Sequence, residues 1–144
     1  MVPLGSDPLQ ELNISQKLWQ SMLADVEQRK PQEACGLIAG IENRCLAVFP
    51  IRNALHSPVR FRMEPGEQLD TFMRIDENDW ELLAIYHSHP SGPSHPSQTD
   101  IAEAAYPEAV NLIWSPKDAS WQCRGFIIRN QQVYEIPIRI SNLE

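Results

Sequence analysis

Three residues able to bind a metal ion lie within the stretch from Tyr86 to Asp100, which has the sequence YHSHPSGPSHPSQTD. The apolar run 80–86 leads into this stretch and predicts a buried strand. Side chains two residues apart on a strand point to the same face, so we expect His87 and His89 to project together from its end. Catalytic zinc sites use three imidazole or carboxylate ligands and leave a fourth position for water. With Asp100 as the third ligand, brought back by the intervening loop, the stretch predicts an open, hydrolytic zinc site.

The same residues also have simpler interpretations. Histidines at the exposed end of a strand are common, so a His-x-His pair alone does not establish a metal site. Ser97 and Asp100 have the spacing of a helix capping box, in which both side chains bond to backbone N–H groups at the start of a helix. The spacing by itself leaves the metal site and the capping box open.

The order of these residues resembles the signature of the JAMM (MPN+) metalloproteases. That signature is a His-x-His-Pro, a spacer of fixed length and a Ser-x-x-Asp, with a glutamate far upstream. Here it is matched by residues 87–90 and 97–100, with Ser97 eight positions after His89. The upstream glutamate corresponds to Glu33, in the sequence EACGLIAG. The resemblance extends from about residue 14 to about residue 138 and fills all five key positions.

The resemblance implies both a fold and a site. The fold is a single MPN-type (cytidine-deaminase-like) α/β domain, with a mixed β-sheet flanked by helices. One Zn²⁺ per chain is held by His87, His89 and Asp100. Glu33 is the general base that takes a proton from the attacking water, and Ser97 donates a hydrogen bond to the oxyanion. The implied reaction is hydrolysis of an amide bond without a covalent intermediate.

The resemblance also implies a class of substrate. Eukaryotic members grip ubiquitin with insertions, and the short interval between Met63 and Trp80 leaves little room for them. The chain therefore resembles the small prokaryotic members, which implies cleavage after the C-terminal Gly-Gly of a ubiquitin-like or sulfur-carrier protein. The bond is either an isopeptide bond to lysine or a peptide bond to a terminal amino acid such as cysteine.

Two other classes of function were weighed. A non-catalytic MPN-type scaffold, which pairs with other subunits, lacks the metal ligands that are present here. A zinc-dependent nucleoside deaminase needs a Cys-x-x-Cys pair and a His-x-Glu, and the sequence has neither. Cys35, close to Glu33, lies in an apolar strand, where we expect a buried structural thiol and not a nucleophile. His56 is expected to be a loop residue, and His95 an exposed loop residue.

Composition limits the partners and the compartment. The 144 residues suit one domain, and 42% apolar with 22% charged residues is an ordinary globular composition. A net charge of −7 argues against a nucleic-acid partner, and no apolar run is long enough to span a membrane. The three cysteines do not suggest a disulfide framework, and no signal peptide is visible, so we expect a cytoplasmic protein. The oligomeric state stays open.

The pattern along the chain predicts strands followed by a helix and then further strands, which favours a mixed sheet flanked by helices. Residues 1–13 are expected to be loosely ordered, the domain to span 14–140, and 141–144 to form a tail. A helix capped by Ser15 should run to about residue 30, another from Pro65 to about 77, and a third from Ser97 to about 106. The second helix should face inward with Leu69, Phe72, Met73 and Ile75. Strands are expected at 35–41, 45–51, 59–63, 80–86, 110–114, 121–128 and 133–140.

Overall fold

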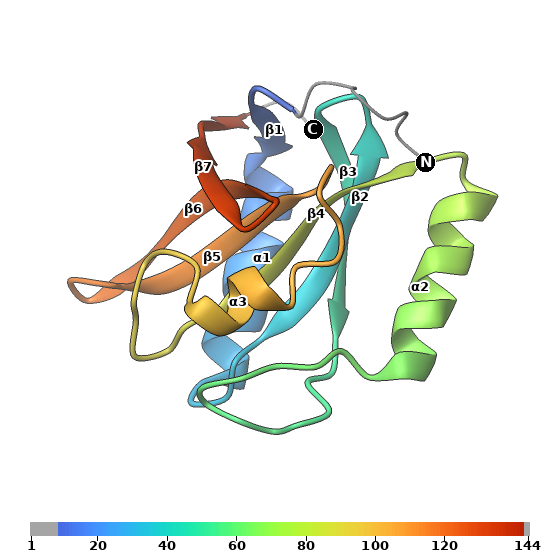
Figure 1. The fold of residues 1–144 in the computed structure, drawn as a ribbon. Coiled ribbons are helices and arrows are strands. Elements are labelled where there is room, and N and C mark those ends of the chain that lie inside the picture. The colour runs from blue at the N-terminus through green and yellow to red at the C-terminus, as the bar shows by residue number, and fades with distance from the viewer. Residues whose placement is uncertain (1–8, 143–144) are drawn as a thin grey trace.

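The structure is a computed structural model that describes residues 9–142. A mixed eight-stranded sheet, ordered β7-β6-β5-β4-β2-β3-β1-β8, forms its centre (Figure 1). β1 runs parallel to β3 and β8, β4 runs parallel to β5, and the other neighbours are antiparallel. The strands are β1 (Leu12–Ser15), β2 (Cys35–Ile41), β3 (Arg44–Ile51), β4 (Glu81–Ser88), β5 (Val110–Lys117), β6 (Ser120–Arg129), β7 (Gln132–Ile136) and β8 (Ile138–Ser141); the helices are α1 (Gln16–Arg29), α2 (Pro65–Glu77) and α3 (Gln98–Ala102).

Local chemistry sets the helix ends. The hydroxyl of Ser15 accepts a hydrogen bond from the Leu18 N–H at 3.2 Å, as expected of an N-cap, and α1 ends shortly before Pro31. In α2 the ring of Pro65 occupies the first turn, where its missing N–H leaves no bond unmade, and the Glu64 carboxylate accepts from the next N–H groups. The predicted first two helices are therefore confirmed.

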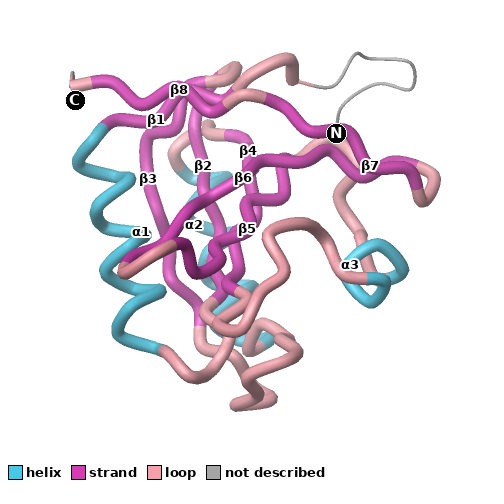
Figure 2. Tube along the Cα trace, turned by 90° about the vertical axis from the view of Figure 1, so that its left-hand side faces the viewer, coloured by secondary structure: helices cyan, strands magenta, loops and turns pink. Residues whose placement is uncertain are grey.

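The two long helices lie on opposite faces of the sheet. Figure 1 shows α1 and α2 on either side of β2, β3 and β4, and Figure 2 shows α1 running alongside β3. Alternate residues of the central strand β2 supply the two cores: Ile38 packs in the cluster that contains Met22 and Val26 of α1, and Leu37 in the cluster that Phe72 of α2 covers. This double burial explains the nearly continuous apolar sequence of β2. The expected mixed sheet flanked by helices is confirmed.

The chain termini differ from the sequence-based prediction. Leu12 and Asn13, expected to be loosely ordered, belong to β1, where Leu12 is fully buried and pairs with Ile138. The predicted strand 133–140 is broken at Pro137, so that β8 leaves β7 and joins β1 at the other edge of the sheet. Ser141, assigned to the tail, is part of β8. Residues 1–8 and 143–144 lie outside the described residues.

Three further predictions were wrong in detail. Residues 59–63 form no strand, and only an isolated bridge joins Asn53 to Met63. The helix after Ser97 ends at Ala102, which brings the Tyr106 ring to 6.0 Å from Phe72. On α2, Leu69 and Met73 are 61% and 53% exposed because the buried face is formed by Thr71, Phe72 and Ile75.

Within residues 9–142, no helix is both long and apolar enough to cross a membrane.

Candidate metal centre and active site

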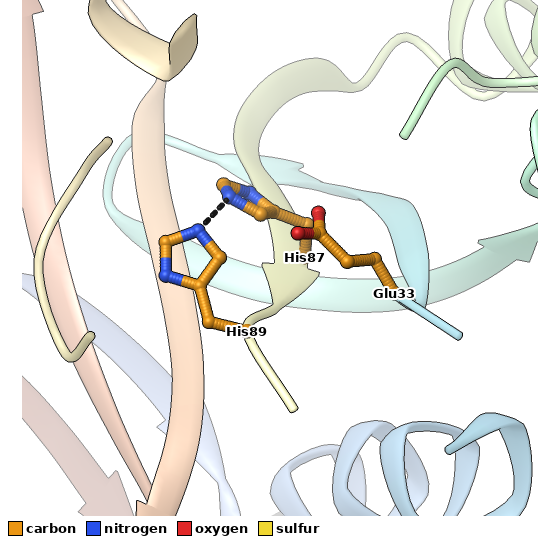
Figure 3. Close-up of side chains that lie close together, drawn as sticks. All are labelled: Glu33, His87 and His89. Carbon is orange, nitrogen blue, oxygen red and sulfur yellow. Dashed lines mark hydrogen bonds between the residues drawn. The ribbon is translucent and has the colours of Figure 1, made fainter. Parts of the chain in front are cut away.

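The end of the central strand β4 presents two imidazoles. His87 is in β4, paired with Cys35 of β2 on one side and Ile113 of β5 on the other, and His89 follows the last strand residue. Both side chains are buried, and their Nε2 atoms lie 3.1 Å apart. Figure 3 shows the two rings turned toward one another, as the two-residue spacing predicted.

Asp100 reaches both imidazoles with a single oxygen. Its Oδ2 lies 3.2 Å from His87 Nε2 and 3.1 Å from His89 Nε2. The capping box is present as well: the same Oδ2 accepts from the Ser97 N–H at 2.9 Å, and the Ser97 hydroxyl accepts from the Asp100 N–H at 3.0 Å. The two interpretations of Asp100 are thus compatible, because the helix start holds the carboxylate where the loop has folded back over the histidines.

The imidazole tautomer at His89 requires a proton or a cation between these groups. His89 Nδ1 donates to the Pro93 carbonyl oxygen at 2.7 Å, which leaves the Nε2 lone pair facing the site. That lone pair and the Asp100 carboxylate oxygen are both acceptors only 3.1 Å apart. Acceptors held this close repel one another unless a proton or a cation lies between them. Such a convergence, in which one ring nitrogen is fixed by a backbone carbonyl, is typical of metal-binding histidines.

Glu33 is brought to the same place from a distant part of the sequence. It precedes β2, and the pairing of Cys35 with His87 sets it beside the end of β4. One ligand atom each from Glu33, His87 and His89 lie within 4.8 Å of one another, so this cluster can hold a metal ion (Figure 3). Glu33 is only 4% exposed. Two carboxylates, Glu33 and Asp100, therefore flank the imidazole pair.

Burial and the neighbouring charges shift the pKa values of this cluster. Burial raises the pKa of Glu33 from 4.5 to about 7, against the attraction of His89 and with the repulsion of Asp100. Burial lowers the pKa of His87. At His89, burial acts in the same direction, but hydrogen bonds to Asp100 and Pro93 outweigh it and raise the pKa. Hydrogen bonds from both imidazoles hold the pKa of Asp100 far below its usual range despite its burial.

A groove runs from the cluster along the loop that joins β3 to α2. It has a volume of about 240 Å³, and its lining includes His87, Ser97 and Asp100. The ring of Phe61 from that loop stacks on His87, with centroids 4.6 Å apart and planes inclined by 26°. Because the Ser97 oxygen accepts from the Asp100 N–H, its own O–H proton remains available to a group in the groove.

Other residues considered in the sequence lie outside this cluster. Burial raises the pKa of Cys35 to about 12, and its thiol donates to the Ile51 carbonyl oxygen at 3.3 Å, so it is a structural thiol as expected. His56 lies in a loop and His95 is exposed, as predicted.

Two contacts support the site; the partner of the first and the existence of the second were not predicted from the sequence. The hydroxyl of Ser88, between the two histidines, accepts from the Ala34 N–H at 2.8 Å and so ties the segment that carries Glu33 to the end of β4. The stacking of Phe61 on His87 was also missed, since it depends on how the 13-residue loop 52–64 folds. Neither has a signature in the sequence, because both are contacts between distant segments.

Comparisons with known proteins agree with this geometry. Residues 15–124 match the family model described as prokaryotic homologs of the JAB domain. The CysO-cysteine peptidase of Mycobacterium tuberculosis is 33% identical over 132 residues, covering 90% of each chain. The desampylase of Pyrococcus furiosus is 44% identical over 69 residues, covering 48% of this chain and 49% of that protein.

Solved structures show the same fold. A protein of Desulfitobacterium hafniense, 34% identical, superposes with a TM-score of 0.81 and covers 90% of this chain and 92% of its own. A JAB1/MPN domain protein from Archaeoglobus fulgidus, at 20% identity and a TM-score of 0.57 over 90% of this chain and 99% of its own, supports the fold alone. The resemblance to small prokaryotic JAMM proteins is confirmed. The chain belongs to the family of prokaryotic homologues of the JAB domain.

Proposed function

We propose that this protein is a zinc-dependent metallopeptidase, with His87, His89 and Asp100 as the metal ligands and Glu33 as the general base. The observation that carries the proposal is the convergence of two Nε2 atoms and one Oδ2 atom at mutual distances of 3.1, 3.1 and 3.2 Å. Ligand atoms at two corners of a zinc tetrahedron with bonds of about 2.0–2.1 Å are about 3.3–3.4 Å apart. The three donors therefore have nearly the spacing that zinc requires, and nitrogen and oxygen donors are those that zinc accepts.

The chemistry follows from the placement of the chain's own groups. Zinc held by the three ligands would supply Lewis-acid activation at neutral pH. Glu33 takes a proton from water as the water oxygen bonds to the scissile carbonyl carbon, and delivers this proton to the amide nitrogen as the C–N bond breaks. A buried carboxylate is suited to both steps because its pKa is raised toward neutrality. Ser97 lines the groove, and its hydroxyl donates to the oxyanion.

We further propose that the substrate is a ubiquitin-like or sulfur-carrier protein, cleaved after its C-terminal Gly-Gly. The support is the set of relatives: a CysO-cysteine peptidase, a desampylase and a probable TtuB-protein conjugate cleaving protease of Thermus thermophilus, the last 34% identical over 96 residues. We place the enzyme in the cytoplasm, where its free thiols Cys35, Cys45 and Cys123 would stay reduced.

Elemental analysis of the purified protein tests the metal site. We expect about one zinc per chain in the wild type and its loss in His89→Ala and Asp100→Asn. The matched control is His95→Ala, which removes an exposed histidine of the same loop and should keep the metal. Retention of zinc in Asp100→Asn with loss in Glu33→Gln would identify Glu33 as the ligand instead. No zinc in the wild type, even after addition of the metal, would favour the non-catalytic scaffold.

Cleavage assays test the reaction. Two substrates are needed. In the first, the C-terminal Gly-Gly of a ubiquitin-like protein is joined by a peptide bond to cysteine, and in the second the same protein is joined by an isopeptide bond to lysine. The products are identified by mass spectrometry. We expect cleavage after the second glycine that a chelator abolishes and zinc restores, and a loss of about 10²-fold or more in Glu33→Gln with zinc retained. Equal cleavage by wild type and Glu33→Gln would refute the assigned base.

A further inference from the structure

One buried side chain organises the loop that joins β3 to α2. Asn53 is 1% exposed, and its Nδ2 donates to the carbonyl oxygens of Arg60 at 2.9 Å and Glu33 at 3.1 Å. Its Oδ1 accepts from the N–H groups of Leu55 at 3.0 Å and Arg62 at 3.2 Å. Both protons and both lone pairs of the amide are therefore used, which is the full bonding capacity of an asparagine side chain.

The bond to Glu33 differs from the others because it leaves the loop. The Glu33 N–H donates to the Ser57 carbonyl oxygen at 2.8 Å, and the Glu33 carbonyl oxygen accepts from Asn53. Both backbone polar groups of Glu33 are thus bonded to the loop. The next residue, Ala34, is bonded to Ser88 at the end of β4. The backbone of Glu33 is held between the loop on one side and the histidine-bearing strand on the other.

The same loop forms one wall of the groove. Arg60, Phe61, Arg62 and Met63 line it, and Phe61 stacks on His87. The loop is closed at its base by backbone bonds that do not involve the Asn53 side chain, including those from the Ala54 N–H to the Arg62 carbonyl oxygen at 2.8 Å and from Glu64 to Arg52 at 2.9 Å. Removal of the Asn53 amide therefore releases the Glu33 carbonyl oxygen, while these backbone bonds keep the base of the loop closed.

We infer that Asn53 is a positioning residue for catalysis, which fixes the backbone of Glu33 to the groove wall so that the carboxylate lies beside the metal ligands. This inference rests on the proposed function, since it assigns Glu33 the role of general base. Asn53 touches neither the reacting atoms nor the metal ligands. It acts through the Glu33 carbonyl oxygen, and a displacement of about 1 Å in a catalytic group can lower a rate about 10²-fold.

Asn53→Asp is the most informative variant, because the carboxylate keeps the acceptor for Leu55 and Arg62 but loses both donors. Asn53→Ser is the second variant, in case a buried charge prevents folding. The matched control is Thr71→Val, which removes a buried hydroxyl bonded to the Glu67 carbonyl oxygen at 2.8 Å in α2, away from Glu33. Each variant is tested as the full, zinc-loaded chain, and its zinc content and thermal stability are measured alongside.

For Asn53→Asp we expect kcat to fall about 10²-fold, KM to change less than about 3-fold, and zinc to be retained. Thr71→Val should lose thermal stability with kcat unchanged. In a Glu33→Gln background, adding Asn53→Asp should lower the residual rate by less than about 3-fold, since the two residues act as one unit. Hydrogen exchange of the Glu33 amide, measured on metal-free protein, should be at least about 10-fold faster in either Asn53 variant.

The inference is overturned if Asn53→Asp and Asn53→Ser keep kcat within about 3-fold of wild type. It is also overturned if the loss of kcat in either variant multiplies fully with the loss in Glu33→Gln, because independent effects are expected of a residue with a merely structural role. Unchanged exchange at the Glu33 amide would also overturn it. Absence of zinc or of cleavage in the wild type would instead count against the proposed function. The exchange experiment would still decide whether Asn53 anchors Glu33.

Discussion

Replacing Glu33 by glutamine should make the metal-free protein more stable, although the same change lowers the activity of the zinc-loaded protein. A carboxyl with a raised pKa resists ionisation in the folded state, and for Glu33 the pKa rises from 4.5 to about 7 through burial. Below pH 4.5 both the folded and the unfolded chain are protonated at this position, so it adds no penalty. As pH rises from 4.5 to 7 the unfolded chain ionises first, and the free energy of unfolding falls. Glutamine has nearly the same shape and does not titrate.

The size of the effect follows from the pKa shift. A change from 4.5 to about 7 corresponds to about 3 kcal/mol, at 1.36 kcal/mol per pKa unit. We therefore expect about 1–3 kcal/mol of added stability in Glu33→Gln above pH 7. Such a gain at a catalytic position is typical of active sites, where function requires a group that folding alone does not favour.

Urea denaturation of chelator-treated protein at pH 5 and pH 8 measures this difference. We expect the gap between Glu33→Gln and wild type to widen by about 1–2 kcal/mol from pH 5 to pH 8. Asp70→Asn, which removes an exposed acid on α2, is the control and should change stability by less than about 0.5 kcal/mol at either pH. A gap that does not depend on pH, or a variant less stable than wild type at pH 8, would refute the reasoning.

Two further predictions concern the core beneath the site. Gly36→Ala should destabilise the protein by more than about 3 kcal/mol in urea denaturation, because the added Cβ would lie 2.6 Å from the Phe49 carbonyl oxygen and against the Tyr86 ring; a loss under about 1 kcal/mol would contradict this packing. Cys35 and Cys45, whose pKa values burial raises to about 12, should react with a disulfide reagent at pH 8 only after unfolding. Rapid labelling of either thiol in the native protein would show that the strands open.

Short-range features were predictable from the sequence because their cause is local. Ser15 and Pro31 bound the first helix as expected, since capping and the missing proline N–H act within one turn. The two faces of β2 were predicted as buried from its continuous apolar sequence. The inward face of α2 was partly wrong, because the helical period leaves more than one apolar stripe possible and packing against the sheet selected the one with Ile75.

Long-range pairing decided what the sequence left open. The run 133–140 has one apolar pattern, yet Pro137 divides it between two edges of the sheet, and β8 joins β1 across most of the chain length. Residues 59–63 have the composition of a strand, but the Asn53 side chain takes backbone groups that a strand would need. The local secondary-structure preference of a segment does not indicate which of its backbone groups a distant buried amide will bind.

The residues of the candidate site also differ in whether local sequence or long-range pairing determines their positions. His87, His89 and Asp100 lie within 14 positions, so strand alternation and a capped helix start are enough to bring them together, and the sequence by itself determined this triad. Glu33 is 54 positions from His87 and reaches it only through the register that pairs Cys35 with His87. A shift of that register by one residue would turn the side chains of β2 to the opposite face. Whether the acid meets the histidines is therefore decided by the tertiary structure, because hydrogen-bond pairing between strands depends on the packing of both faces of the sheet.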